Sequence, residues 1–230
     1  MRVFVGFKES DSAVALEIQA RCGSNVQLVF WPNKRGEKID EFSLFPENIG
    51  QPDDYYFHYS GYQKISEELL NLFDQRALNL HPAPPWYRGS GGLNLAIYYG
   101  EKKFGLTLHH LSPTYDDGQI IKLYDVELHA DENIMSASLR INNLRLQIFK
   151  QIIQDVCDSG AVDNTIVVPT DIIKWEGRLY KMSEIDDLAL VNLDNENSFD
   201  DLNRRIKAFA TKDFPLVLKS RHGNYKVYSF

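Results

Sequence analysis

The chain has 230 residues, 43% of them hydrophobic and 25% charged, which is typical of a globular protein with one large domain or a domain and an appendage. A net charge of −7 argues against nucleic-acid binding, which requires a cationic surface. No apolar run approaches the roughly 20 residues that cross a bilayer, and the N-terminus does not resemble a secretory signal, so no membrane association is expected. Cys22 and Cys157 lack the spacing of a disulfide framework or a zinc site, which favours the cytoplasm.

Strand-like and helix-like segments alternate in the first part of the chain. Strands are expected at 2–7, 26–31, 53–60 and 77–81, and helices at 11–22 and 65–75. This β-α-β order predicts an α/β fold with a Rossmann-like, mostly parallel sheet and helices on both faces. Ligands of such sheets bind beyond the carboxyl ends of the strands, which is where Asn79 and His81 lie.

A shaped loop follows His81, because residues 82–92 contain several prolines and glycines. Further elements are expected as a helix at 92–102, strands at 105–111 and 120–128, and a long helix at 134–157. The apolar positions of the long helix recur at helical spacing, and we expect them to face the core or a partner in a homodimer; they are Leu139, Leu144, Ile148, Ile152 and Val156.

The character of the sequence changes after Gly160. Short strand-like pieces at 165–169 and 189–193 accompany a helix at 199–210 and a final strand at 225–230. The sequence therefore predicts a main domain at 1–160 and a small C-terminal α+β module at 161–230, which would close the site or form a dimer.

Three polar side chains form the most informative constellation. Asn79 and His81 point to the same face of a strand because side chains alternate with period two. Asp116 comes from a separate loop and could orient the imidazole. An amine that attacks a carbonyl must lose a proton, for which a histidine is suited, and the resulting oxyanion can be stabilised by an amide N–H. Alone, His81 would more often be a buried or capping histidine.

Two stretches resemble the signatures of folate-dependent formyltransferases. LNLHPAPPWYRG (78–89) matches N-x-H-P followed by Y-R-G, and GLTLHHLSPTYDDGQII (105–121) matches G-x-T-x-H followed by D-x-G. The resemblance is strong over 53–128. It implies that Asn79, His81 and Asp116 are the catalytic residues, that N10-formyltetrahydrofolate is the formyl donor, and that no metal is needed.

The resemblance also suggests which residues bind ligands. Tyr115 lies in the loop that wraps the pterin in the family, so this loop, with the carboxyl end of the strand at 53–60, is expected to contact the folate; the residues are Tyr59, Ser60, Tyr115, Asp117 and Gly118. Tyr87 and Arg88 are expected to bind the substrate, although Arg88 could equally hold loop carbonyls, and Asp117 is more typical of a solvated loop residue. His109 is expected to be structural, and Trp86 and Trp175 are left open between base stacking and partial burial.

The branch of the family is inferred by elimination. The segment GFKESDS (6–12) lacks the glycine-rich phosphate loop of the members that formylate glycinamide ribonucleotide, and the length after Asp116 leaves little room for the barrel of the members that formylate methionyl-tRNA. We therefore expect a nucleotide-linked amino sugar, carried by dTDP or GDP and used for O-antigen or a related glycan, as the acceptor. Another small amine, or a non-catalytic folate-binding role, is the alternative.

Overall fold

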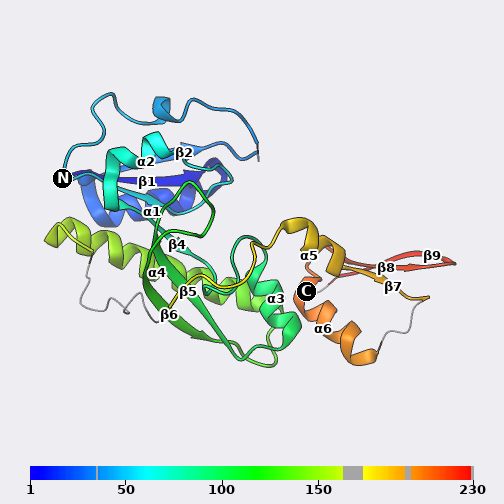
Figure 1. The fold of residues 1–230 in the computed structure, drawn as a ribbon. Helices are drawn as coiled ribbons and strands as arrows, with labels where there is room; N and C mark the ends of the chain where they lie inside the picture. Colours follow the sequence, from blue (N-terminus) through cyan, green and yellow to red (C-terminus); the bar gives the residue numbers. More distant parts are fainter. Residues whose placement is uncertain (35, 163–172, 195–197, 229–230) are drawn as a thin grey trace. The chain divides into compact units, whose positions relative to one another are not determined.

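The computed structural model describes residues 1–34, 36–162, 173–194 and 198–228 (Figure 1). The strands are β1 (Val3–Lys8), β2 (Val26–Trp31), β3 (Tyr55–His58), β4 (Ala77–His81), β5 (Lys103–His110), β6 (Ile120–Glu127), β7 (Leu190–Asn192), β8 (Leu216–Ser220) and β9 (Gly223–Val227). The helices are α1 (Ser12–Cys22), α2 (Glu67–Phe73), α3 (Gly92–Tyr99), α4 (Ile134–Ser159), α5 (Met182–Leu188) and α6 (Phe199–Phe209). None of the helices in the described ranges is long and apolar enough to span a membrane.

The main sheet has the strand order β2-β1-β3-β4-β5-β6. The neighbours β2, β1, β3 and β4 pair in parallel, as the β-α-β order predicts, whereas β5 pairs antiparallel with β4. The expected Rossmann-like α/β fold with an additional small sheet is thus confirmed. The chain forms two compact units, and the first contains Met1–His81, Thr107–Leu123 and Arg145–Trp175.

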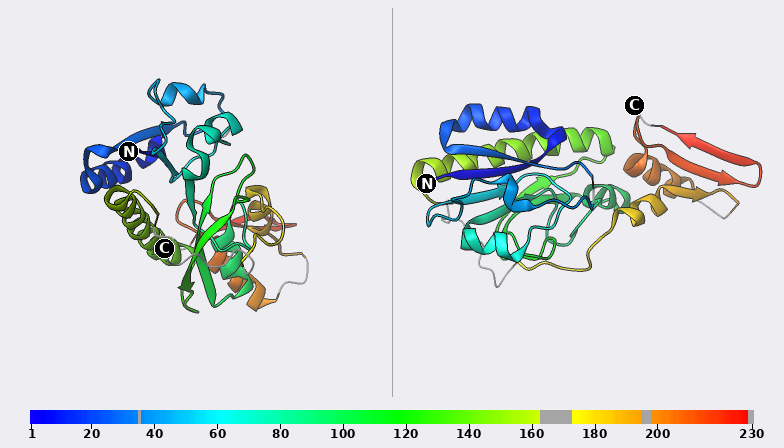
Figure 2. Two further views of the ribbon diagram at one scale, coloured as in Figure 1. Left: turned by 60° about the vertical axis from the view of Figure 1, so that its left-hand side comes forward. Right: turned by 90° about the horizontal axis from the view of Figure 1, so that it is seen from above.

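Helices cover both faces of the parallel strands in this first unit (Figure 2). Tyr56 and Phe57 are adjacent on β3 and therefore point in opposite directions. Tyr56 packs with Phe73 of α2, while Phe57 meets Phe149 of α4 edge to face with ring centroids 5.9 Å apart. Lys150 of α4 pairs with Glu17 of α1, so these two helices share one face and α2 covers the other.

The second unit contains Pro82–Leu106, Tyr124–Leu144 and Glu176–Phe230. It includes the small sheet β7-β8-β9, in which β7 and β8 are parallel and β8 and β9 are antiparallel. The side chain of Asn94 on α3 donates to the carbonyl of Ala208 on α6 over 2.7 Å, and the hydroxyl of Tyr98 donates to Asp201 over 2.9 Å. These contacts fix α3 against α6.

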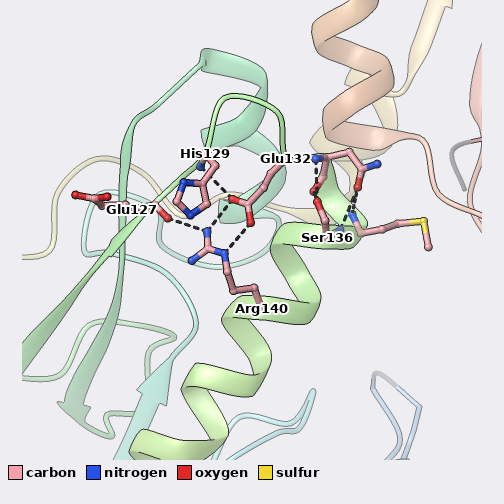
Figure 3. Close-up of polar contacts among 7 residues, drawn as sticks. Glu127, His129, Glu132, Ser136 and Arg140 are labelled. Carbon is pink, nitrogen blue, oxygen red and sulfur yellow. Dashed lines mark hydrogen bonds and ion pairs between the residues drawn. The ribbon is translucent and has the colours of Figure 1, made fainter.

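The start of α4 is held by a polar network (Figure 3). The side-chain oxygen of Asn133 accepts from the backbone N–H groups of Met135 and Ser136, both at 3.0 Å, and so satisfies donors that the first turn leaves without partners. Arg140 binds both carboxylate oxygens of Glu132, at 2.6 and 2.7 Å, and the carbonyl of Glu127 at 2.8 Å. The connection between β6 and α4 is therefore fixed by one guanidinium and one cap.

The buried row of α4 differs from the predicted one. Leu139 is 67% exposed, whereas Ala137, Ile141 and Phe149 are buried. The helix carries two apolar rows, and the spacing alone does not determine which of them meets the sheet. Ile152 and Val156 of the predicted row are buried as expected.

Two expectations for the C-terminal part remain open. Each unit is assembled from several segments of the chain, so the predicted boundary after residue 160 stays a prediction, as does a homodimer. The strand expected at 165–169 lies outside the described residues. The strand expected at 189–193 corresponds to β7, while α5 and β8 were not predicted from the sequence.

Candidate active site

The pairing of β4 with β5 brings four polar side chains together on one face of the sheet. The antiparallel register places Asn79 opposite His109 and His81 opposite Thr107. Residues directly opposite each other in an antiparallel pair point to the same face. The side chains of His81, Thr107 and His109 are buried there at 5%, 0% and 2% exposure.

Asp116 reaches His81 from the loop between β5 and β6. Its Oδ1 lies 3.3 Å from Nδ1 of His81, and the side chain of Asp116 is only 12% exposed. The backbone of Asp116 has a φ of +47°, a left-handed conformation that aspartate adopts more readily than most residues and that often occurs at functional sites. A neutral His81 imidazole that donates its Nδ1 hydrogen to the carboxylate of Asp116 carries its lone pair on Nε2.

His109 is a neutral ring that orients Asn79. Burial lowers the pKa of His109 to about 4, so this ring is uncharged at neutral pH. Its Nδ1 lies 2.8 Å from the carbonyl oxygen of His110, which can only accept, so Nδ1 must carry the hydrogen. Nε2 is then an acceptor, and the amide nitrogen of Asn79 donates to it over 3.2 Å. The contact of 3.9 Å between His109 and Asp116 is consequently not an ion pair.

Trp175 packs against both imidazoles and anchors the loop that carries Asp116. Its ring centroid lies 4.8 Å from that of His109 at 89°, and 5.9 Å from that of His81 at 68°. The indole N–H donates to the carbonyl oxygen of Gly118 over 2.6 Å. The sequence left the role of Trp175 open, and nothing in its local pattern predicts a position beside the histidines.

Gly118 is required by a close approach of two backbone segments. A Cβ at this position would lie 1.8 Å from the carbonyl oxygen of His110. The glycine of the D-x-G sequence therefore lets the loop return against β5, where the N–H of His110 donates to the carbonyl of Gln119 over 2.9 Å. This geometry holds Asp116 near His81.

Arg145 is a buried residue near the site that the sequence reasoning missed. Its guanidinium donates to the carbonyl oxygen of Leu80 at 3.0 Å and to that of Tyr59, and it lies 4.2 Å from the centroid of the Tyr59 ring. It thus ties together the chain at the carboxyl ends of β3 and β4. Arg145 lies four residues after Ile141 and four before Phe149, which places it in the buried row of α4. A charged residue at helical spacing between apolar ones is the signal that could have identified it.

The residues predicted to bind the folate have different surroundings. Tyr59 is buried against Phe149 and Arg145, and Ser60 accepts from the backbone N–H of Lys8 at 3.1 Å. Tyr115 is 40% exposed and donates its hydroxyl hydrogen to the carbonyl of Tyr62 over 2.9 Å. Asp117 is exposed. Contact of these residues and Gly118 with a folate stays a prediction.

Tyr87 and Arg88, the predicted substrate-binding residues, belong to the second unit. Tyr87 is 5% exposed, near the rings of Phe104 and Tyr180, and burial raises the pKa of its hydroxyl. The carbonyl oxygen of Arg88 accepts from the N–H of Tyr180 over 2.9 Å. Gly89, with a φ of +85°, lies so close to Tyr180 that a Cβ would be 2.4 Å from its carbonyl oxygen. Whether the first two side chains contact a substrate stays a prediction.

The site thus combines a histidine–carboxylate pair with an oriented amide. His81 can accept a proton at Nε2, and one hydrogen of the Asn79 amide is engaged by His109, which leaves the second for a ligand oxygen. Among the described residues, no group of three or more His, Cys, Asp or Glu side chains is arranged to hold a metal ion. The arrangement can therefore support proton transfer and oxyanion stabilisation by protein groups.

The fold and the site define a Rossmann-like α/β protein with a histidine–carboxylate pair and an amide at the carboxyl end of a central strand. The chain belongs to the formyl transferase family, which it matches over residues 56–181, more than half of its length. Methionyl-tRNA formyltransferase from Ehrlichia chaffeensis is 26% identical over 94 residues, 40% of this chain and 31% of that protein. The chain thus spans about a third of the length of this relative.

Solved structures share the fold over nearly the whole chain. Rv3404c from Mycobacterium tuberculosis, a candidate sugar N-formyltransferase, has a TM-score of 0.75 at 18% identity, covering 99% of this chain and 96% of that one. An N-formyltransferase from Helicobacter canadensis, in complex with folinic acid and dTDP-3-aminofucose, has a TM-score of 0.64 at 16% identity, covering 95% and 84%. At these identities the comparison establishes the fold.

Proposed function

We propose that this protein transfers a formyl group from N10-formyltetrahydrofolate to the primary amine of a nucleotide-linked amino sugar. The observation that carries the proposal is the His81–Asp116 contact of 3.3 Å beside the amide of Asn79. Membership of the formyl transferase family supports the reaction class. The folate and the dTDP-linked amino sugar bound by the Helicobacter canadensis protein support the donor and the kind of acceptor.

Each of the three side chains has a distinct role in this reaction. His81 takes a proton from the amine through Nε2 as the bond between the amine nitrogen and the formyl carbon forms. Asn79 donates a hydrogen bond to the oxyanion, a contribution of about 100-fold to 1000-fold in rate in comparable sites. The bond between the formyl carbon and N10 of the folate then breaks, and His81 returns the proton to N10. Asp116 holds the imidazole through Nδ1.

The curated relative that acts on methionyl-tRNA suggests a different acceptor, but the charge of this chain does not favour it. A net charge of −7 is unsuited to binding the phosphates of a tRNA. A nucleotide-linked sugar carries only a local negative charge, which a few lysine or arginine side chains can bind. The acceptor is thus proposed to be a small molecule.

The proposal is tested by incubating the protein with 10-formyltetrahydrofolate and a panel of amino sugars linked to dTDP or GDP. We expect release of tetrahydrofolate together with a sugar product about 28 mass units heavier than the substrate, because a formyl group replaces one hydrogen of the amine. The His81→Ala variant is the matched control for background hydrolysis. If the folded protein formylates no sugar of the panel, the proposed acceptor is wrong; if it also fails with free amino sugars and other amines, the proposed reaction is wrong.

A further inference from the structure

The pairing of β3 with β4 stops before β4 reaches the candidate base. The last pair of this parallel register is His58 with Asn79. One step further, the same register would match Tyr59 with Leu80. Instead, the N–H of Tyr59 donates to the carbonyl oxygen of Gly6 on β1 over 2.8 Å. The chain after β3 therefore turns toward β1 and separates from β4 at Leu80.

Arg145 of α4 takes the place of this missing pair. Its Nε donates to the carbonyl oxygen of Leu80 over 3.0 Å, and its Nη2 donates to the carbonyl oxygen of Tyr59. The two nitrogens lie on one edge of a planar, rigid group. The guanidinium thus fixes the distance between the two carbonyl groups at the point where the ladder of backbone hydrogen bonds ends.

Burying this guanidinium has a cost that packing alone does not require. Arg145 is 8% exposed, and burial lowers the pKa of its guanidinium, as expected for a cation that has left water. No carboxylate forms an ion pair with it in the part of the chain that the structure describes. The two carbonyl dipoles and the ring of Tyr59, 4.2 Å away, balance its charge instead. An apolar side chain would fill the buried row of α4 without taking a charge out of water.

The peptide group that Arg145 holds leads directly into His81. The carbonyl of Leu80 belongs to the same peptide bond as the backbone N–H of His81, and Nδ1 of His81 lies 3.3 Å from Asp116. β5 pairs with the other edge of β4 as far as His81, so Arg145 supports the edge that β3 has left. Asp116 comes from a separate loop, so a shift at the end of β4 changes its distance from the imidazole.

We propose that Arg145 is a positioning residue for the candidate base, which sets where His81 lies relative to Asp116 by holding the carbonyl oxygen of Leu80. It acts through the backbone and needs no contact with a ligand. The inference rests on the proposed function, in which His81 takes a proton from the amine. A misplacement of about 1 Å in such a site lowers the rate about 100-fold, so the expected effect is on kcat.

Two substitutions test this role. Arg145→Met keeps an unbranched side chain and removes every donor, whereas Arg145→Lys keeps the charge and replaces the fork by a single donor group. We expect kcat for formyl transfer to fall about tenfold to 100-fold in Arg145→Met, with a KM for 10-formyltetrahydrofolate within about threefold of the wild type. Arg145→Lys should recover part of kcat. Steady-state release of tetrahydrofolate, with the amine that the wild type formylates, measures both constants.

Lys150→Met is the matched control, because Lys150 is a second buried cation of α4 and pairs with Glu17 of α1. Its kcat should stay within about twofold of the wild type, whatever the substitution does to the free energy of unfolding. Urea denaturation measures that free energy for each variant. If Arg145→Met does not fold, Arg145→Lys is compared with Lys150→Met in its place.

A spectroscopic readout follows His81 without turnover. The chain has 6 histidines, and in protein grown with isotope-labelled histidine the Cε1–H resonance of His81 is the one missing from the spectrum of His81→Gln. We expect this resonance to shift in Arg145→Met, or in Arg145→Lys where only that variant folds, and to keep its wild-type position in Lys150→Met.

The outcomes separate the positioning role from the proposed function. The positioning role is overturned if kcat falls no further in the Arg145 variants than in Lys150→Met, or if the His81 resonance does not move in them. If the wild type formylates no amine but the resonance shifts as expected, the proposed function alone is refuted. If the wild type is active and the Arg145 variants are as active as the control, the positioning role alone is refuted.

Discussion

His81 is the residue on which the proposed reaction depends most directly. It lies at the end of β4 with Nδ1 facing Asp116, so removal of the imidazole removes the proposed base. We expect His81→Ala to lower kcat by about 100-fold to 10,000-fold, the usual contribution of general acid–base catalysis. Tetrahydrofolate release measures kcat, and fluorescence titration with folinic acid should give a Kd within a few-fold of the wild type. A variant with near-normal kcat would show that another group is the base.

We expect His109 to make a different contribution, because its Nε2 holds the side-chain amide of Asn79. In His109→Phe the ring and its burial are retained, but the acceptor for the amide of Asn79 is lost. We expect kcat to fall about tenfold to 100-fold with little change in the KM for the folate, and His109→Gln, which keeps an acceptor, to recover part of the activity. Steady-state kinetics measures both constants.

The neighbouring histidine provides the control for this series. His110 is adjacent on β5, so its side chain points to the opposite face of the sheet, and its Nδ1 has no hydrogen-bond partner among the residues that the structure describes. His110→Gln should therefore leave kcat within about twofold. If kcat fell by the same factor in His109→Phe and in His110→Gln, both substitutions would act by loosening β5.

At the residue scale, the sequence predicts the side chains of the site but not their supports. The strand period puts Asn79 and His81 on one face, and the resemblance to the D-x-G signature identifies Asp116. The structure places the three side chains close together. Trp175 is distant in the sequence, and only the tertiary fold places it beside the two histidines. Arg145 could have been recognised as a charged residue in a buried helical row.

At the scale of elements, the cap of α4 is a testable feature. Asn133 accepts hydrogen bonds from two backbone N–H groups in the first turn of α4, and its own N–H donates to Ser136 Oγ over 3.1 Å. Asn133→Ala removes the acceptor, and we expect the free energy of unfolding to fall by about 1 kcal/mol. Urea denaturation measures this loss, and Asn133→Asp, which keeps an acceptor, should retain most of the stability. A loss of the same size in both variants would contradict the cap.

The elements and the parallel pairing of the first four strands were largely predictable, but the direction of β5 was not. Apolar runs such as β1 and β2, and the alternation with α1 and α2, follow from local periodicity. The antiparallel direction of β5 is set by how the chain returns along β4, and a strand has the same periodicity in either direction. α5 was missed because it has only 7 residues, so its apolar positions Met182, Ile185 and Leu188 cover fewer than two turns, which is too short a row to identify a helix.

At the scale of the whole molecule, two buried histidines make stability depend on pH. His58 accepts a hydrogen bond at Nδ1 from the hydroxyl of Tyr56 over 2.8 Å, and that hydroxyl in turn accepts from the indole N–H of Trp31 over 3.0 Å. Burial lowers the pKa of His58 to about 4, as it does for His109. In the unfolded chain both rings have a pKa of about 6.5.

The sign of the effect follows from proton binding. Below pH 6.5 the two histidines bind protons in the unfolded chain, but in the folded protein they stay neutral until the pH approaches 4. The free energy of unfolding is therefore highest above pH 6.5 and declines as the pH falls. Between pH 7 and pH 5 each histidine should lower the free energy of unfolding by about 2 kcal/mol, or about 4 kcal/mol together.

Urea denaturation at pH 7, 6 and 5 measures this decline, and the range stays above the pH at which most carboxylates titrate. His109→Gln removes one of the two groups, so the decline should fall to about half in that variant, even though its stability at pH 7 is also reduced. The exposed His222, substituted by Gln, serves as the control and should leave the decline unchanged. A free energy of unfolding that is constant from pH 7 to pH 5 would show that the two rings are not held neutral. In that case the orientation assigned to Asn79, which requires an unprotonated Nε2 on His109, would fail as well.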